Sequence, residues 1–305
     1  MAKPLGLSRL SDIDLRLLRI YKTVVEAGGF AAAEVELNIS RAAISMAMGD
    51  LETRLGLRLC LRGRAGFSVT EAGQQVYDAI LQLLAAIEGF RTQVNALHDQ
   101  LQGELNIGIA DNLVTLPHMR ITNALRELKH KGPEVTINIS MMAPNEIEKA
   151  ILDGRLHVGA IPETRRLPEL DFQPLYEEES RLYCSFQHPL FNDAEKHLSI
   201  EQVPSFDAVA PAYAQTAQTR QHYQQLKTSS TATDREGVAF LILTGCFIGY
   251  LPTHYAAQWI QQDKLRAIAP GHFHFTTNYG IVTRRSKRPN SVLDSWLKAL
   301  WHPVS

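Results

Sequence analysis

The sequence is poor in cysteine and has no long apolar segment. Its three cysteines, Cys60, Cys184 and Cys246, are far apart and odd in number, which argues against a disulfide framework or a paired-cysteine metal site and fits a reducing cytoplasm. The most apolar run, residues 238–251, contains two glycines and is too short to span a bilayer. The first fifteen residues lack the apolar stretch of a secretory signal. We therefore expect a cytoplasmic protein with no membrane partner.

The chain also lacks an excess of either charge and lacks catalytic signatures. Its 305 residues carry a formal net charge of −1, which argues against a general polyanion binder but not against a local basic patch. No GxSxG, HExxH, GxxxxGK or glycine-rich dinucleotide fingerprint occurs, so we expect neither an enzyme nor a cofactor. His272 and His274 would share one face of a strand, but without a third ligand an ordinary surface or core pair is favoured over a metal site.

Residues 30–55 contain two short helices joined by a tight turn. Residues 31–37 are rich in helix formers, and Ser40 is a natural N-cap for a second helix over 41–55. Large apolar residues of the second helix recur every three or four positions and form one buried stripe. The opposite face has small side chains and one cation, as a helix in the DNA major groove requires; an ordinary helical hairpin is the alternative. The predicted DNA-contacting residues are Ser40, Arg41, Ala42, Ser45 and Met46.

Residues 57–69 are predicted to form a β-hairpin, or wing. Leu57, Leu59 and Leu61 alternate with other residues, and a second short run follows two glycines. Four arginines and no acid lie between residues 54 and 64. We predict that Arg62 and Arg64, at the tip, bind DNA phosphates; a solvated turn is the alternative.

A long helix is expected after Thr70. Its apolar residues alternate between spacings of four and three, a heptad pattern typical of a coiled coil. A single amphipathic helix packed on one domain is the alternative. A coiled-coil dimer would imply a two-fold or near two-fold DNA site. The predicted dimerisation residues are Val76, Ile80, Leu83, Ile87, Phe90, Val94, Leu97 and Leu101.

Strands and helices alternate beyond Gly103, and the βαβαβ run over residues 104–161 predicts a mostly parallel sheet with helices on both faces. A further α/β portion is expected over roughly residues 166–277. The predicted strands are 104–109, 135–140, 157–161, 180–186, 247–251 and 279–283. The predicted helices are 116–129, 145–152, 216–226, 236–243 and 291–301.

Several segments together resemble the LysR-type transcriptional regulators over essentially the full chain. They are FAAAEVELNISRAAIS, DLETRLGLRLCLR, RAGFSVTEAG, LNIGIADNLVTLP and AILDGRLHVGAI. The resemblance implies an α/β fold class with a winged helix-turn-helix (1–69), a coiled-coil linker helix (70–102) and an effector domain (103–305). That domain would have two α/β lobes like type 2 periplasmic binding proteins: lobe I about 104–165 and 278–305, lobe II about 166–277.

The resemblance further implies a homodimer that pairs into a tetramer on double-stranded DNA, and RNA polymerase is expected as another partner. Family ligands lie at the carboxyl ends of strands and at helix N-termini. Asp111 beside Asn112, where the family often has serine or threonine, suggests an effector with an amino group or several hydroxyls. Helix capping is the alternative for Asn112, Asn145 and Asp234. The implied effector-binding residues are Asp111, Asn112, Asn145, Tyr213 and Asp234, with Pro144, Ala212 and Arg235 adjacent.

The sequence therefore predicts a sequence-specific DNA-binding transcriptional regulator. A small-molecule effector between the two lobes is expected to modulate its DNA binding or its transcriptional output. The alternatives are a solute-binding module or an enzyme without a DNA role, and either of these would ignore duplex DNA.

Overall fold

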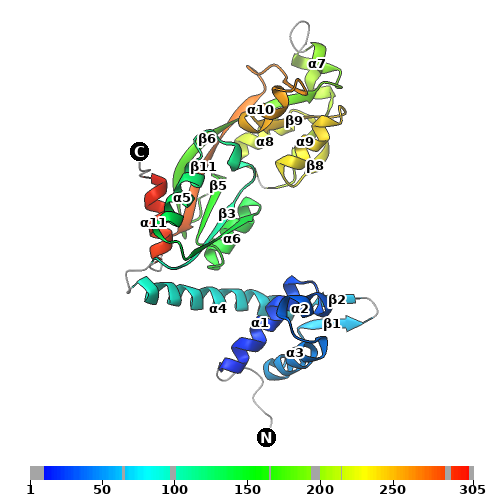
Figure 1. Ribbon diagram of the computed structural model, residues 1–305. Coiled ribbons are helices and arrows are strands. Elements are labelled where there is room, and N and C mark those ends of the chain that lie inside the picture. The colour runs from blue at the N-terminus through cyan, green and yellow to red at the C-terminus, as the bar shows by residue number, and fades with distance from the viewer. Residues whose placement is uncertain are drawn as a thin grey trace. The chain divides into compact units, whose positions relative to one another are not determined.

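The computed structural model describes residues 10–63, 66–96, 101–164, 166–193, 200–213, 215–285 and 290–301 (Figure 1). The chain divides into two compact units, residues 1–87 and 88–305. No helix in the described part of the chain is long and apolar enough to cross a membrane.

The N-terminal unit is a three-helix cluster with a small hairpin, and its second and third helices and the hairpin agree with the sequence prediction. Ser11 and Asp14 form a reciprocal capping box at the start of the first helix, and Ser40 caps the third by accepting from the Ala43 N–H at 3.3 Å. The helices pack around Tyr21, Ile44 and other buried side chains. The elements of this unit are α1 (Asp12–Glu26), α2 (Phe30–Leu37), α3 (Arg41–Leu55), β1 (Cys60–Gly63) and β2 (Gly66–Val69), followed by α4 (Glu71–Ala96).

The start of the wing differs from the predicted leucine alternation. Leu59 is buried, whereas Leu57 and Leu61 are exposed, because residues 57–59 lie in a loop that precedes β1. The Glu52 side chain holds this loop by accepting from the backbone N–H of Leu59 at 2.8 Å. The hairpin itself is confirmed, with Cys60 opposite Val69 in an antiparallel pair.

The heptad positions of α4 fall into two environments, one buried against the N-terminal unit and one exposed. Ile80 is buried, and Val76 and Leu83 pack against the core of the N-terminal unit, so these three predicted dimerisation residues stabilise their own fold. Phe90 and Val94 are 66% and 38% exposed. The periodicity marks an apolar stripe, but only tertiary packing decides which residues the same chain covers. Leu97 lies outside the described residues, and Leu101 packs against a core of the C-terminal unit.

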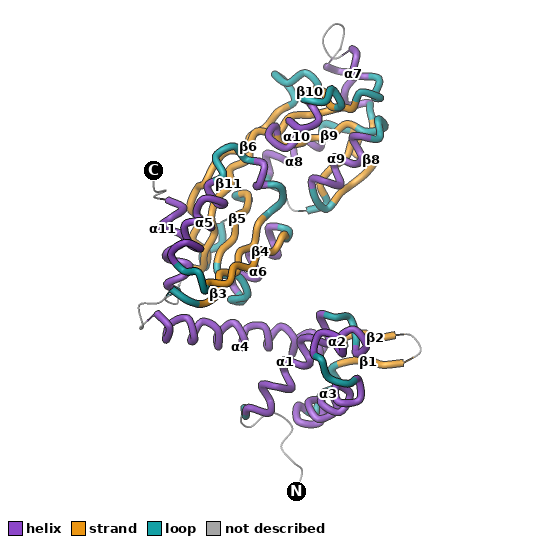
Figure 2. Tube along the Cα trace, in the orientation of Figure 1, coloured by secondary structure: helices purple, strands orange, loops and turns teal. Residues whose placement is uncertain are grey.

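The C-terminal unit is built on one mixed sheet (Figure 2). Its strand order is β4-β3-β5-β11-β6-β9-β7-β8, and β10 pairs with β6. Pairs β3–β4 and β3–β5 are parallel, so the parallel sheet predicted from the βαβαβ run is confirmed. The later strand β11 is antiparallel to both of its neighbours, which makes the whole sheet mixed. The strands are β3 (Gly103–Ile109), β4 (Val135–Met141), β5 (Val158–Pro162), β6 (Leu170–Ser185), β7 (Asp207–Pro211), β8 (Lys227–Ala232), β9 (Ile248–Pro252), β10 (Leu265–Ala267) and β11 (His274–Arg284).

Two long strands, β6 and β11, join the two lobes of this unit. They pair from Leu170 with Arg284 to Arg181 with His274, with one shift of register between Tyr279 and Gly280. Leu170 and Leu175 belong to the same core as β3 and β5, although we expected residues 166–277 to lie in the second lobe. The lobes therefore divide within these two strands, and a pattern of separate short strands cannot reveal such a division. We call the lobe around β3, β4 and β5 the first lobe, and the lobe around β7, β8 and β9 the second lobe.

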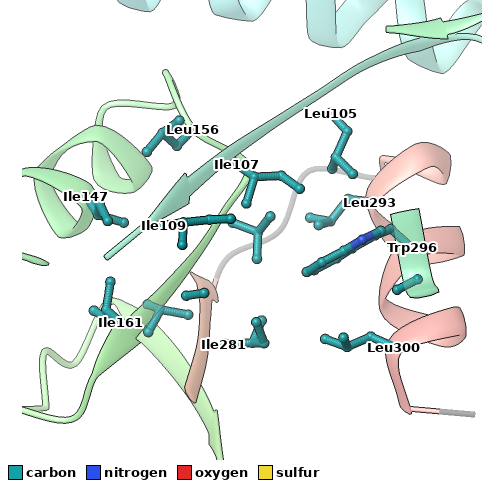
Figure 3. Close-up of a cluster of buried hydrophobic side chains, with 14 of the residues drawn as sticks. Leu105, Ile107, Ile109, Ile147, Leu156, Ile161, Ile281, Leu293, Trp296 and Leu300 are labelled. Carbon is teal, nitrogen blue, oxygen red and sulfur yellow. The ribbon is translucent and has the colours of Figure 1, made fainter. Parts of the chain in front are cut away.

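The first lobe packs helices on both faces of its sheet. Leu105, Ile107 and Ile109 alternate along β3 and are buried; Figure 3 shows them between Ile147 on one side and Trp296 on the other. Gly108 lies on the Ile147 side, where an added Cβ would come 2.9 Å from an Ile147 carbon. The glycine thus lets a helix approach the sheet closely. The elements around this sheet are η1 (Leu113–Thr115), α5 (Arg120–Lys131), α6 (Pro144–Leu152) and α11 (Ser291–Trp301).

The second lobe has a separate apolar core on each face of its sheet. The helix predicted at 236–243 is confirmed as α9, but β7, β8 and the helix after β9 were not predicted. His272 lies in a turn, where its N–H donates to the Ala269 oxygen, so the predicted alternation of His272 and His274 along a strand is wrong. The helices of this lobe are α7 (Leu190–Asp193), η2 (Ile200–Ser205), α8 (Ala217–Gln224), α9 (Arg235–Leu243) and α10 (Thr253–Ile260).

The contact between α4 and the wing gives a test of the N-terminal packing. A Cβ on Gly73 would lie 2.0 Å from the Leu59 carbonyl oxygen. We expect Gly73→Ala to destabilise the N-terminal unit by about 1–3 kcal/mol, because backbone must move to make room. Hydrogen exchange of α1 and α3 amides would measure the loss. Gly89→Ala, on the same helix with nothing within 4 Å, is the control, and the α1 and α3 amides of this variant should exchange no faster than those of the parent. Equally fast exchange in both variants would contradict this packing.

Candidate functional site

The exposed face of α3 carries the residues predicted to contact DNA. Ile44, Met48 and Leu51 are fully buried on one side, so the helix presents the opposite side to solvent. Arg41, Ala42 and Met46 are exposed there, and Ser45 is half-buried. Ser40 has the capping role already described. The helix thus shows a cation near its N-terminus beside short side chains, a shape that allows close approach to base edges.

A hollow adjoins this face of α3. It has a volume of about 460 Å³ and is lined by Arg41, Ser45, residues 28–32, Gly66 and Phe67. The rings of Phe30 and Phe67 meet edge to face, with centroids 5.9 Å apart, so the wing is fixed against the start of α2. Within the part of the chain that the structure describes, no side chain forms a capping hydrogen bond at the N-terminus of α2. Helix α3, the base of the wing and the start of α2 therefore share one surface.

The arginines near the wing do not all have the same role. Arg54 forms an ion pair with the buried Asp14 at 3.1 Å, which stabilises the packing of α3 on α1. Arg62 lies in β1 opposite Phe67, and Arg64 lies outside the described residues. The basic run of the sequence is thus partly structural.

A buried ion pair lies where the two lobes of the C-terminal unit meet. Arg235, the first residue of α9, donates to both carboxylate oxygens of Glu178 on β6, at 2.9 and 2.5 Å. It also donates to the Tyr279 hydroxyl at 2.7 Å. The Glu178 side chain is fully buried, and that of Arg235 is 10% exposed. Such a pair is stable in a dry interior only when both charges are fully hydrogen-bonded.

Further contacts extend this ion pair across the lobes. Asp111, directly after β3 in the first lobe, accepts from the backbone N–H of Arg235 in the second. His254 on α10 contacts Glu178 at 3.0 Å with one ring nitrogen and the Thr115 hydroxyl at 2.6 Å with the other. Side chains from both lobes therefore converge on a single network of charges.

The network shifts the pKa values of its members. Burial by itself raises the pKa of Glu178, but the Arg235 charge and the hydrogen bonds from His254 and Arg235 outweigh it, so the pKa lies below its usual value. Burial raises the pKa of Asp111 despite its contacts with Arg235. Burial also raises the pKa of Tyr213 and Tyr279, so both phenols stay protonated at neutral pH.

A cavity of about 610 Å³, which we call the inter-lobe cavity, opens beside this network. Four of the five predicted effector-binding residues line it: Asp111, Asn112, Tyr213 and Asp234. Asn145 does not, because the chain turns into α6 and only its neighbours Pro144 and Glu146 reach the wall. Asp234 also caps α9 by accepting from the Gly237 N–H at 2.7 Å, so the capping alternative is correct for it. Asn112 makes no capping hydrogen bond to any residue that the structure describes.

A second cavity of about 740 Å³ lies against α5 and is mainly apolar. Leu113, Leu116, Ile121 and Leu125 contribute to its wall, and Glu178 and His254 close one end. Asn112 and Met141 line both cavities. Both cavities take walls from both lobes, and the inter-lobe cavity is the more polar of the two.

Sequence reasoning missed Glu178, His254 and Tyr279 as parts of the site. Glu178 is the middle of three consecutive acids on a strand, Glu177 to Glu179. Because side chains alternate across a strand, the middle acid faces away from its neighbours. That pattern could have indicated a buried carboxylate in need of a cation, but not which cation.

Both units match known protein families. The family described as "Bacterial regulatory helix-turn-helix protein, lysR family" matches residues 15–74. The family described as "LysR substrate binding domain" matches residues 98–302.

Relatives match over nearly the whole chain. The HTH-type transcriptional activator BauR of Pseudomonas aeruginosa is 56% identical over 295 residues, which cover 97% of each protein. The SDS degradation transcriptional activation protein of a Pseudomonas species is 26% identical over 284 residues, covering 90% of this chain and 91% of that protein. Full-length CbnR solved with its target DNA is similar in fold, with a TM-score of 0.68, 19% identity, and coverage of 94% of this chain and 98% of that chain.

The buried ion pair can be tested by removing one charge. We expect Glu178→Gln to destabilise the C-terminal unit by about 3–5 kcal/mol at pH 7, because it leaves the Arg235 charge buried without compensation. Glu178 has a lowered pKa, so its contribution is present above the usual carboxyl pKa of about 4.3 and is lost as pH falls through the folded value. The difference in unfolding free energy between the parent and Glu178→Gln should therefore become smaller as the pH falls.

Denaturant unfolding followed by tryptophan fluorescence would measure this difference, since all three tryptophans lie in the C-terminal unit. Glu179→Gln is the matched control on the same strand. Glu179 pairs with Arg181 at 2.9 Å, and both side chains are about two-fifths exposed, so its loss should cost at most about 1 kcal/mol. A similar loss of unfolding free energy in the two variants would show that the buried ion pair does not stabilise the C-terminal unit.

Proposed function

The chain belongs to the LysR family of DNA-binding transcriptional regulators, and we propose that α3 reads its operator while the inter-lobe cavity holds the effector that sets its output. The observation that carries this proposal is the exposed face of α3, which combines Arg41 with short side chains next to the wing. The net charge of −1 means that DNA attraction is local to this surface rather than general.

The proposed DNA contacts follow from the exposed face of α3 and from the arginines in the sequence of the wing. Arg41, at the start of α3, can donate two hydrogen bonds to guanine, and Met46, 70% exposed, offers an apolar contact for a thymine methyl. Ser40, Ala42 and Ser45 allow the helix backbone to come close. Arg62 and Arg64 bind phosphates from the wing, a role that fixes orientation rather than sequence.

A second copy of the chain is the proposed partner for the later part of α4. Ile87, Phe90 and Val94 continue the heptad spacing beyond the residues that pack on the N-terminal core. An exposed phenylalanine on a long helix favours burial against an identical helix. The homodimer would place two α3 helices on a two-fold operator, and pairing of dimers would give a tetramer.

Regulation is proposed to act through lobe closure. The inter-lobe cavity has walls from both lobes, so a bound molecule can favour one closure state and thereby shift the equilibrium of the whole chain. The relative at 56% identity is named a transcriptional activator, and we propose activation here too, with RNA polymerase as a further partner and the cytoplasm as the location.

The DNA-reading face is tested by Arg41→Ala. We expect a loss of about 1–3 kcal/mol in binding to the operator, with a smaller loss on a scrambled duplex, because a base contact contributes only on the correct sequence. The operator would be located by footprinting the DNA upstream of the gene for this chain, and affinities measured by fluorescence anisotropy at two salt concentrations. Arg19→Ala, an exposed arginine of α1, is the control. Unchanged operator affinity for Arg41→Ala would show that the reading face lies elsewhere.

The dimerisation role of α4 is tested by Phe90→Asp. Because Phe90 is exposed in the single chain, this substitution should leave the fold intact while placing a charge in the proposed helix–helix contact. Sedimentation velocity should then show monomers. Gln82→Asp, an exposed position of the same helix off the seam, should remain dimeric; a Phe90→Asp protein that sediments like the parent would refute this interface.

A further inference from the structure

The charges on the wall of the inter-lobe cavity are mostly negative. Asp111, Glu146, Asp234 and Glu236 line it, and Arg235 is its one basic lining residue within the described part of the chain. Glu146 and Glu236 are exposed and form no ion pair with any described residue. A molecule in this cavity therefore meets carboxylates from both lobes.

Arg235, the one basic residue among the described lining residues, already forms an ion pair within the chain. Both terminal nitrogens of the Arg235 guanidinium donate to Glu178, and one also donates to Tyr279. Glu178 is fully buried behind it, so the pair contributes almost no net positive charge to the cavity. An anionic ligand would have to displace a bidentate, desolvated carboxylate to reach this arginine.

The backbone N–H groups at the N-terminus of α9 also have partners within the chain. Helix N-termini attract anions because their first N–H groups have no partner within the helix. Here Asp111 accepts from the N–H of Arg235, and Asp234 accepts from the N–H of Gly237. The chain's own carboxylates thus occupy the position where a ligand carboxylate would otherwise bind.

One buried polar group of a residue on the cavity wall has no hydrogen-bond partner among the described residues. The side-chain nitrogen of Asn112 is buried and donates no hydrogen bond to the described residues. A buried N–H without a partner is costly, and an acceptor oxygen on a ligand would remove that cost. Asn112 follows Asp111 in the chain, and both residues line the cavity just beyond the end of β3.

From these contacts we infer that the effector of the inter-lobe cavity is a small primary amine that also carries an acceptor oxygen. Its ammonium group binds among Asp111, Glu146 and Glu236, and its oxygen accepts from Asn112. The inference rests on the proposed effector role of this cavity and names the chemical class of the effector. A volume of about 610 Å³ suits a metabolite of this size. Closure of the lobes then brings together carboxylates that repel one another until the ammonium lies between them.

The test is calorimetry on the full-length protein with matched probes. The amines are ethanolamine, 3-aminopropanol and 4-aminobutanol; for each, the diol and the hydroxy acid of equal length replace the ammonium by a neutral or an anionic group. We expect at least one amine to bind, and its diol and hydroxy acid to bind at least tenfold more weakly. Binding of a hydroxy acid or a diol as tightly as its amine, or no binding by any amine, would overturn the inference.

Two variants connect the binding to the cavity wall. Glu146→Gln and Glu236→Gln keep side-chain size and remove one negative charge each, and each should weaken amine binding at least fivefold. Glu134→Gln is the control, since Glu134 is exposed on the same lobe and lies away from the cavity. Unchanged amine affinity in both cavity variants would place the ammonium elsewhere and overturn the assignment.

Operator footprinting with the same probes separates this inference from the proposed function. If a hydroxy acid rather than an amine alters the footprint, the cavity still regulates, but the ammonium assignment is wrong. If an amine binds with the expected variant pattern and alters neither the footprint nor transcription in vitro, the ligand class is correct and the regulatory role of the cavity is wrong.

Discussion

The C-terminal unit depends on one buried ion pair, between Arg235 on α9 and Glu178 on β6. Charges of this kind are costly to bury, so the surrounding structure must satisfy them completely. Tyr279, His254 and the backbone of Asp111 provide the remaining contacts. These groups come from both lobes and from the two strands that join them. Each lobe therefore provides hydrogen bonds that the buried ion pair needs.

The same ion pair decides what the neighbouring cavity can bind. A free arginine at the start of α9 would make the inter-lobe cavity a site for anions. With its charge matched by Glu178 and its helix start occupied by Asp111, the cavity keeps the negative charge of the surrounding carboxylates. The stability of the unit and the ligand preference that we propose therefore depend on the same contacts. This coupling also gives a physical route from ligand binding to lobe closure, because a ligand near Asp111 acts on a residue that already bridges the lobes.

In the N-terminal unit, the buried face of α3 determines which of its residues are exposed. Ile44, Met48 and Leu51 fix the rotation of the helix, and Arg54 holds it to α1 through Asp14. What remains outside is the face with Arg41 and Met46. An arginine count around the wing could not separate these roles, since Arg54 is a structural cation and Arg41 is not paired with an acid within the described residues.

The sequence by itself determined the family, the helix-turn-helix with its Ser40 cap, the wing and the α/β character of the C-terminal unit. These depend on local periodicity and on side chains close in the chain, which a sequence pattern records directly. Only the tertiary structure decided that Ile80 is buried against its own unit, that β6 and β11 run through both lobes, and that Glu178 pairs with Arg235 across 57 residues of chain. Contacts between residues so far apart depend on how strands align in the folded sheet, and no local pattern contains that information.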